Sequence, residues 1–255
     1  TINAHDLLIT GGNGGQQNVA GIFTNVTGQT TIVNATGAVT LTGGLGNDAL
    51  AIIASNTNDV DVTVNAAGAV TLQGGGGGFT SYGALAAIGA INGFNANVTI
   101  NGQSSVSMSK GAGTNANAFI GSDTAGGTLN LKSGLGGSGD FAVNDGVIKT
   151  TGAATVIANG TGNLTQSTTT TSITGNAGVT LGGANIGTAA NPIVFEAGGN
   201  TVSASASSGG IYLKQATGNL LTSKYVLSNG GTGQTISLAP VSGSITVDST
   251  AGFNA

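Results

Sequence analysis

A short phrase that the chain repeats constrains its fold more than any other feature. NATGAVTLTGG occupies residues 34–44, NAAGAVTLQGG occupies 65–75, and the shorter NAGVTLGG occupies 176–183. Each copy runs from an Asn through a Gly turn and alternating residues to a Gly pair. In the first copy Val39 and Leu41 point to one side of a strand, and Thr40 points to the other. A turn-strand-turn unit with one apolar face cannot bury that face alone, so we expect it to stack on copies of itself.

Short alternating strands separated by Gly, Asn or Ser turns recur along the rest of the chain. Examples are Val60, Val62 and Val64, then Val98 and Ile100, and later Ile236 and Leu238. Edge strands of a sandwich are usually protected by charge or proline, yet only 5% of this chain is charged. In a β-helix each strand pairs with the strands above and below it, and only the two ends expose edges. We therefore predict an all-β, elongated parallel β-helix (β-solenoid) that forms a single shaft over residues 1–255.

The repeat logic also gives an expected coil size. At about 20 residues per coil, the chain would form roughly a dozen coils. The spacing between Asn34 and Asn65 is longer than that, and we expect an inserted loop, such as the segment 43–58, to account for it. Residues 74–95 depart from the pattern in another way. Leu85, Ile88 and Ile91 have helix-like spacing with glycines between them, so we expect a loop excursion there, with a helical turn at most.

The composition excludes several classes of protein. The chain has 48 Gly, five scattered Lys and no Arg, with a formal net charge of −4. Phosphate binding needs clustered Lys and Arg, so a nucleic-acid partner is not expected. The chain has no Cys for a disulfide scaffold, and no apolar run of about 18 residues that would span a membrane. It begins at Thr1 without Met or a leader, so we expect a processed product or an excerpt of a longer protein.

One nonapeptide resembles a calcium-binding pattern. GGLGNDALA at residues 43–51 fits G-G-x-G-x-D-x-U-x, which makes Asp48 the candidate calcium ligand. Successive copies share each calcium ion in such rolls, and the nearest second match, GGSGDFAV at 136–143, is one residue short and distant in sequence. A structural turn is therefore the favoured interpretation, and calcium at Asp48 is the alternative. Otherwise no cofactor is expected.

The other candidate site residues are few. His5 is the single histidine, and we interpret it as a polar turn residue because a metal site needs several ligands. Asp59 and Asp61 share one strand face, but neither Arg nor His lies near them in sequence, so a solvated outer face is favoured over glycosidase chemistry. Loops on rigid scaffolds often bind ligands. Tyr82 and Phe94 in the 74–95 excursion are therefore candidate contact residues, with packing onto the body as the alternative.

The last third of the chain resembles a known family. NIGTAANPI at 185–193, GNTVSASASSGGIYL at 199–213 and the flanking GNL segments at 162 and 218 are similar to the haemagglutination-type repeat region of filamentous haemagglutinin-like exoproteins. These are bacterial surface adhesins exported by two-partner secretion. The resemblance covers about sixty residues, and it implies a right-handed parallel β-helix, secretion and a place on the bacterial cell surface. The family's secretion domain, an Arg-Gly-Asp motif and a basic heparin-type patch are not recognisable.

Three functions follow as hypotheses. The first is a non-enzymatic extracellular protein, the rigid shaft of an adhesin, with glycans or proteins of host or neighbouring cells as partners. The second is a structural subunit of a surface layer, sheath or filament that assembles end to end. The third is a polysaccharide-degrading enzyme, which the lack of Arg and of a carboxylate cluster disfavours. Ice binding is also disfavoured, because Thr-x-Thr does not recur at a fixed interval. We expect a protein that is not an enzyme.

Overall fold

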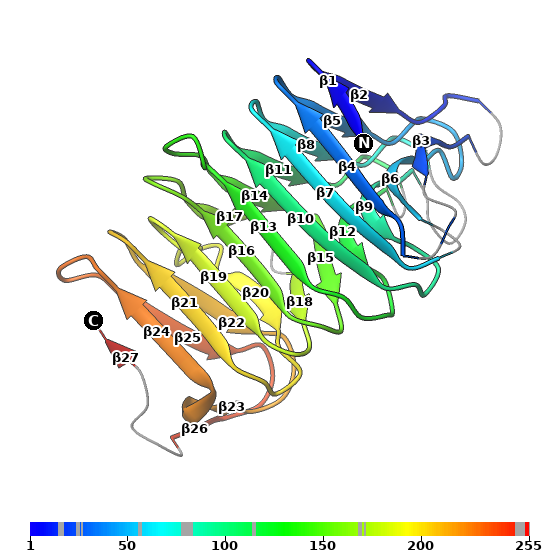
Figure 1. Ribbon diagram of the computed structural model, residues 1–255. Helices are drawn as coiled ribbons and strands as arrows, with labels where there is room; N and C mark the ends of the chain where they lie inside the picture. The colour runs from blue at the N-terminus through cyan, green and yellow to red at the C-terminus, as the bar shows by residue number, and fades with distance from the viewer. Residues whose placement is uncertain are drawn as a thin grey trace.

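The computed structural model is a parallel β-helix whose coils follow one another along a single axis (Figure 1). The structure describes residues 1–14, 18–23, 26, 28–55, 58–77, 84–113, 116–167, 170, 172–247 and the backbone of 253–254. Strands from successive coils pair in parallel, which confirms the predicted fold class. Within the described residues the one helical element is the 3-10 helix η1 (Thr222–Lys224).

Three long sheets run along the sides of the helix, and a small fourth sheet joins two strands near the C-terminal end. The ten-stranded sheet contains, in order, β1 (Ile2–Ala4), β4 (Thr30–Ala35), β7 (Val60–Ala66), β10 (Ala96–Gly102), β13 (Leu129–Ser133), β16 (Ala154–Ala158), β19 (Val179–Gly183), β21 (Val202–Ala206), β24 (Tyr225–Asn229) and β27 (Phe253–Asn254). The six-stranded sheet contains β2 (Leu7–Thr10), β5 (Val39–Thr42), β8 (Val70–Gln73), β11 (Val106–Ser109), β14 (Phe141–Asn144) and β17 (Leu164–Gln166).

The nine-stranded sheet contains β3 (Ala20–Phe23), β6 (Ala51–Ser55), β9 (Ala86–Ala90), β12 (Ala118–Ser122), β15 (Val147–Thr150), β18 (Ile173–Gly175), β20 (Ile193–Glu196), β22 (Ile211–Gln215) and β25 (Ile236–Pro240). The two-stranded sheet pairs β23 (Leu220–Leu221) with β26 (Ile245–Thr246). Most coils thus contribute one strand to each of the three sides, and the turns between the sides form the corners.

Aliphatic side chains stack in register along the interior. One column in the ten-stranded sheet runs through Val33, Val64, Ile100, Leu131, Val156, Leu181, Ala204 and Leu227, all at most 1% exposed. A column in the nine-stranded sheet runs through Ile53, Ile88, Ile120, Ile148, Ile173 and Phe195, all fully buried. Burying each such side chain contributes about 1.5–3 kcal/mol, so these columns are the main source of stability.

The coils are longer than the sequence predicted, and the prediction of an inserted loop at 43–58 is wrong. Asn34 and Asn65 are register partners that lie 31 residues and a single coil apart. The segment 43–58 includes β6, which forms the third side of the coil. Later coils are shorter. In one of them, 23 residues separate Asp140 from Asn163, which stacks on it. A coil of about 20 residues was expected from the repeat class, but three strands and three corners need more chain.

The first two copies of the repeated phrase stack as predicted, whereas the third occupies a different side. Val39 and Leu41 of β5 pair with Val70 and Leu72 of β8 in the six-stranded sheet. The third copy forms β19 in the ten-stranded sheet, where Val179 pairs with Ala154 of β16. The same local sequence therefore makes the same strand, but contacts distant in sequence decide which side of the coil it occupies.

The Gly pairs that end the first two copies allow successive coils to approach closely. A Cβ atom at Gly44 would lie 2.1 Å from the carbonyl oxygen of Gly12, and one at Gly75 would lie 2.0 Å from that of Gly44. The same relation continues to Gly111, where a Cβ would lie 2.0 Å from the oxygen of Gly75. Any larger residue in this corner column would collide with backbone atoms of the neighbouring coil.

The segment 74–95 contains a strand where a loop excursion was expected. Ala86–Ala90 forms β9, which pairs with β6 on one side and β12 on the other. All five residues of β9 are buried, as are all those of β6 and β12. Ile88 belongs to the main core, while Ala87, Leu85 and Ile91 belong to a second apolar cluster on the other face of the sheet. Because both faces are covered, the strand lacks the simple alternation that marks half-buried strands.

Candidate functional site

The predicted calcium ligand, Asp48, lies between β5 and β6 in a left-handed backbone conformation with φ of 51°. The near match to the calcium-binding pattern, at 136–143, lies on a later coil and not beside Asp48. Asp140, in the near match at 136–143, precedes β14 of the six-stranded sheet, and its Oδ1 accepts a hydrogen bond from the Asn163 backbone N–H at 2.7 Å. Within the described residues no group of three or more His, Asp or Glu side chains is gathered. Calcium at Asp48 stays a prediction, testable by a calcium-dependent melting temperature that Asp48→Asn abolishes.

Of the two predicted contact residues in the segment 74–95, the structure describes only Phe94. Tyr82 lies outside the residues that the structure describes. Phe94 is partly buried, and its side chain packs against the main core. Its carbonyl oxygen accepts a hydrogen bond from the Ser122 hydroxyl at 2.6 Å. These contacts place Phe94 in a corner of the coil, where it supports the turn into β10.

Asp59 and Asp61 line a groove of about 310 Å³ on the outer face of the ten-stranded sheet, together with Asn95 and Asn97 of the next coil. Asp59 accepts hydrogen bonds from the side-chain amide of Asn95 at 3.0 Å and from its backbone N–H at 2.9 Å. These two donors, the side-chain amide first, hold the pKa of the Asp59 carboxyl below its usual value. Asp61 accepts from the Asn97 side chain at 2.8 Å. Both carboxylates therefore tie adjacent coils together.

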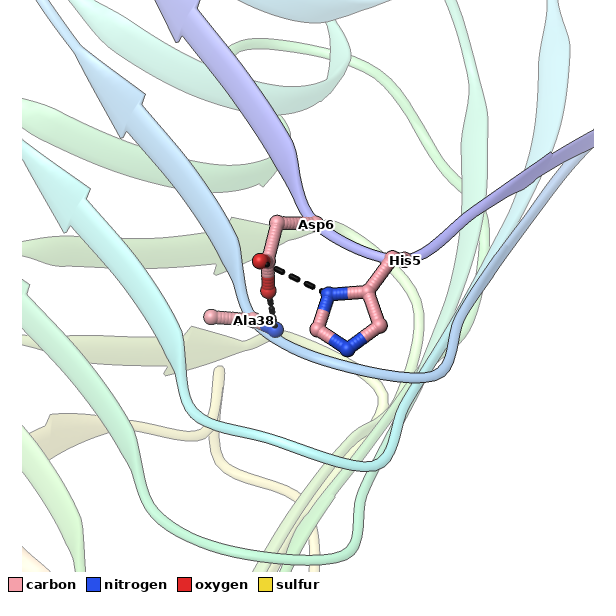
Figure 2. Close-up of polar contacts among 3 residues, drawn as sticks. All are labelled: His5, Asp6 and Ala38. Carbon is pink, nitrogen blue, oxygen red and sulfur yellow. Dashed lines mark hydrogen bonds and ion pairs between the residues drawn. The ribbon is translucent and has the colours of Figure 1, made fainter.

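His5 and Asp6 occupy the exposed corner between β1 and β2 (Figure 2). His5 Nδ1 lies 2.8 Å from Asp6 Oδ2, and the backbone N–H of Ala38 in the next coil donates to Asp6 Oδ1 at 2.7 Å. The Ala38 N–H, with a smaller contribution from His5, lowers the pKa of the Asp6 carboxyl. The position of His5 in a polar turn matches the interpretation favoured from the sequence.

A row of asparagines follows the outer face of the ten-stranded sheet. The side-chain amide of Asn34 donates to Asn3 Oδ1 at 2.9 Å, that of Asn65 to Asn34 at 2.8 Å, and that of Asn101 to Asn65 at 2.8 Å. We call these four residues the asparagine ladder. Each bond joins neighbouring coils, so the ladder reinforces the stack along its axis.

A second groove, of about 460 Å³, lies at a corner of the later coils. We call it the Tyr212 groove; its lining includes Asn163, Thr165, Asn185, Thr188, Tyr212 and Gln234. Isolated bridges pair Leu164 with Ile186 and Ile186 with Ile211, which sets the register of this corner. One outward column consists of the residues directly before these inward side chains, namely Asn163, Asn185 and Gly210. A second outward column consists of the residues directly after them, namely Thr165, Gly187 and Tyr212.

Two glycines make room for the side chains of the Tyr212 groove. A Cβ atom at Gly209 would lie 1.5 Å from Oδ1 of Asn185, and a Cβ at Gly210 would lie 2.5 Å from Cε2 of Tyr212. The Asn185 amide and the Tyr212 ring therefore lie along the surface of the helix, over backbone that carries no side chain. The phrases NIGTAANPI at 185–193 and GNTVSASASSGGIYL at 199–213 supply these residues, but the sequence did not predict the groove, because the two phrases meet only when the coils stack.

The comparisons with known proteins give no family. The chain matches no protein-family model, no curated protein and no solved structure. The filamentous haemagglutinin-like resemblance therefore stays a prediction from the sequence. Among the described residues, no helix has the length and apolar character needed to cross a membrane.

Proposed function

We propose that this chain is the rigid β-helical shaft of a non-enzymatic extracellular surface protein, an adhesin or related exoprotein. The observation that carries the proposal is the ten-stranded parallel sheet, which continues in register from β1 to β27. At a strand spacing of about 4.8 Å, ten strands extend roughly 43 Å along the axis. A stack with a continuous apolar interior resists bending, as a spacer between a cell and its target requires.

The surface chemistry supports the same role. With 5% charged residues the chain is solvated mainly through hydroxyl and amide groups. The asparagine ladder and the bonds from Asn95 and Asn97 to Asp59 and Asp61 use outward side chains to join coils. Outward residues thus reinforce the shaft. The family resemblance in the last third of the sequence also supports a role as the shaft of a surface protein.

The test is the location and shape of the parent protein. Antibodies against this chain should label intact cells that produce it, and brief protease treatment of those cells should remove the label. Electron microscopy of the purified chain should show isolated short rods. Retention of the protein inside intact cells would overturn the proposal, as would hydrolysis of a polysaccharide by the purified chain.

A second candidate function is a structural subunit of a surface layer, sheath or filament. It is favoured by large apolar side chains that are exposed on the last coils: Leu221, Val226, Val241, Ile245 and Val247 are between 38% and 77% exposed. Association between copies or with a partner would cover exposed apolar side chains of this size. Filaments or lattices of the purified chain in electron micrographs, lost when Val226 and Val241 are both changed to Ser, would support this function over the isolated shaft.

A further inference from the structure

We propose that the Tyr212 groove binds a neutral oligosaccharide. The inference deepens the proposed surface role, on which it rests, by naming a ligand class for it. The groove is larger than the one lined by Asp59 and Asp61, and its lining of Asn, Thr, Gly, Ala, Tyr and Gln contains no ionisable acid or base apart from the tyrosine phenol. A lining of amides and hydroxyls favours a ligand that is uncharged and rich in hydrogen-bonding groups.

The amides of the groove are held in fixed orientations by the coil stack. Asn185 Nδ2 donates to Asn163 Oδ1 at 2.7 Å, and the backbone N–H of Gly210 donates to Asn185 Oδ1 at 3.2 Å. Asn163 Nδ2 in turn donates to Asp140 Oδ1 at 3.3 Å. An Asn side chain has two N–H donors and two acceptor lone pairs. These bonds use one donor and one acceptor of each amide, and the second N–H and the second lone pair remain for a ligand.

Paired donors and acceptors of this kind match the hydroxyl groups of a sugar. Adjacent hydroxyls on a pyranose ring each donate and accept, so one amide can bond to both through its N–H and its oxygen. The Asn163 and Asn185 amides belong to neighbouring coils, and stacked strands lie about 4.8 Å apart. The two amides can therefore contact different hydroxyl groups of one ligand. Thr165 and Thr188 add hydroxyl groups to the same lining.

Tyr212 supplies the apolar contact that a sugar also needs. One face of many pyranose rings carries only C–H groups, and such a face packs against an aromatic ring while the ring's hydroxyl stays in water. Tyr212 is only partly buried, and its ring lies over Gly210 beside the amide column. The preorganised backbone limits the ordering cost of binding, because the stacked coils already fix these positions.

The experiment uses the purified chain on an array of immobilised neutral, sialylated and sulfated oligosaccharides. We expect binding to neutral structures. For a bound sugar measured by titration calorimetry, Tyr212→Ala should weaken binding about tenfold or more, because it removes the stacking surface. Tyr212→Phe should change the affinity less than about threefold, since it keeps the ring. Asn34→Ala removes a ladder amide outside the groove and should bind as the unaltered chain does.

A second measurement needs no variant and guards against loss of folding in Tyr212→Ala. Addition of the bound sugar should shift the side-chain amide resonances of Asn163 and Asn185 in the unaltered chain, and leave those of Asn34 and Asn65 in place. Binding to no neutral sugar, binding only to anionic sugars, or shifts confined to residues outside the groove would each overturn the inference. A chain displayed on the cell that binds no sugar would overturn this inference alone. A sugar-binding chain retained inside the cell would overturn the surface role alone.

Discussion

The side-chain amide of Asn65 donates a hydrogen bond to Oδ1 of Asn34 at 2.8 Å, and the two residues are register partners in adjacent strands of one sheet. Both belong to the repeated phrase, so the sequence repeat and the structural coil coincide here. The relation shows how this chain uses uncharged side chains on its outside. Interior columns supply the free energy of burial, and the outward amides fix the register between coils.

Loss of an inner member of the asparagine ladder should destabilise the chain more than loss of its end member. Asn65 both donates to Asn34 and accepts from Asn101, whereas Asn3 only accepts from Asn34. Asn65→Ala should lower the free energy of unfolding by about 1–2 kcal/mol, because two hydrogen bonds are lost. Asn3→Ala, the matched control, should cost about half as much. Urea denaturation of the two variants measures the difference, and an equal loss in both would contradict a coupled ladder.

The facing of β7 predicts opposite effects for two neighbouring substitutions. Val62 is 1% exposed within the core, while Thr63 points outward. Val62→Asp places a carboxylate among aliphatic side chains and should lower the free energy of unfolding by about 3 kcal/mol or more. Thr63→Asp adds the same charge on the outer face and should cost less than about 1 kcal/mol. Thermal unfolding followed by circular dichroism distinguishes them, and similar losses would argue against the assigned facing.

The glycine column at the end of β8 should not tolerate a methyl group. A Cβ atom at Gly75 would lie 2.0 Å from the Gly44 carbonyl oxygen, and backbone atoms cannot move aside cheaply. Gly75→Ala should destabilise the chain by about 1–3 kcal/mol. A Cβ at the exposed Gly14 would meet no atom within 4 Å, so Gly14→Ala should change stability by less than about 0.5 kcal/mol. If Gly75→Ala left the stability unchanged, adjacent coils would be able to separate at this corner.

The Asp59 carboxyl should titrate below the usual range for aspartate. Its lowered pKa comes first from the Asn95 side chain and then from the Asn95 backbone N–H. A carboxyl whose pKa is lowered by folding contributes stability above its unfolded pKa, and that contribution disappears as the pH falls through the folded pKa. The stability contribution of Asp59 should therefore be complete at neutral pH and decline below about pH 4.

A pair of variants tests the cause of that shift. Asn95→Ala removes the main donor to Asp59 and should move the Asp59 pKa upward toward its usual value. Asn97→Ala removes the donor to Asp61 and likewise an acceptor for the next coil, so it is the matched control and should leave the Asp59 pKa lowered. Carbon NMR of the side-chain carboxyl against pH reports each midpoint. The assignment fails if the Asp59 midpoint is the same in both variants.

Local pattern predicted the strands that alternate between buried and exposed residues, and the facing of their side chains. Alternation in segments such as Val60 to Val64 fixes which side chains can be buried together, because successive residues of a strand point to opposite faces. Val39 and Leu41 likewise stack on Val70 and Leu72, as the repeated phrase predicts. The pattern was misleading at Ala86–Ala90, where both faces are buried and the spacing of Leu85, Ile88 and Ile91 resembled that of a helix.

The sequence by itself determined that this chain must stack short parallel strands, since repeated half-apolar units with almost no charge have few other ways to cover their apolar faces. Only the tertiary structure decided the length of each coil, the sheet that receives the third copy of the phrase, and the meeting of Asn163, Asn185 and Tyr212 in one groove. The reason is physical. Alternation is a property of neighbouring residues, whereas closing a coil depends on contacts between residues more than twenty positions apart, which no local pattern specifies.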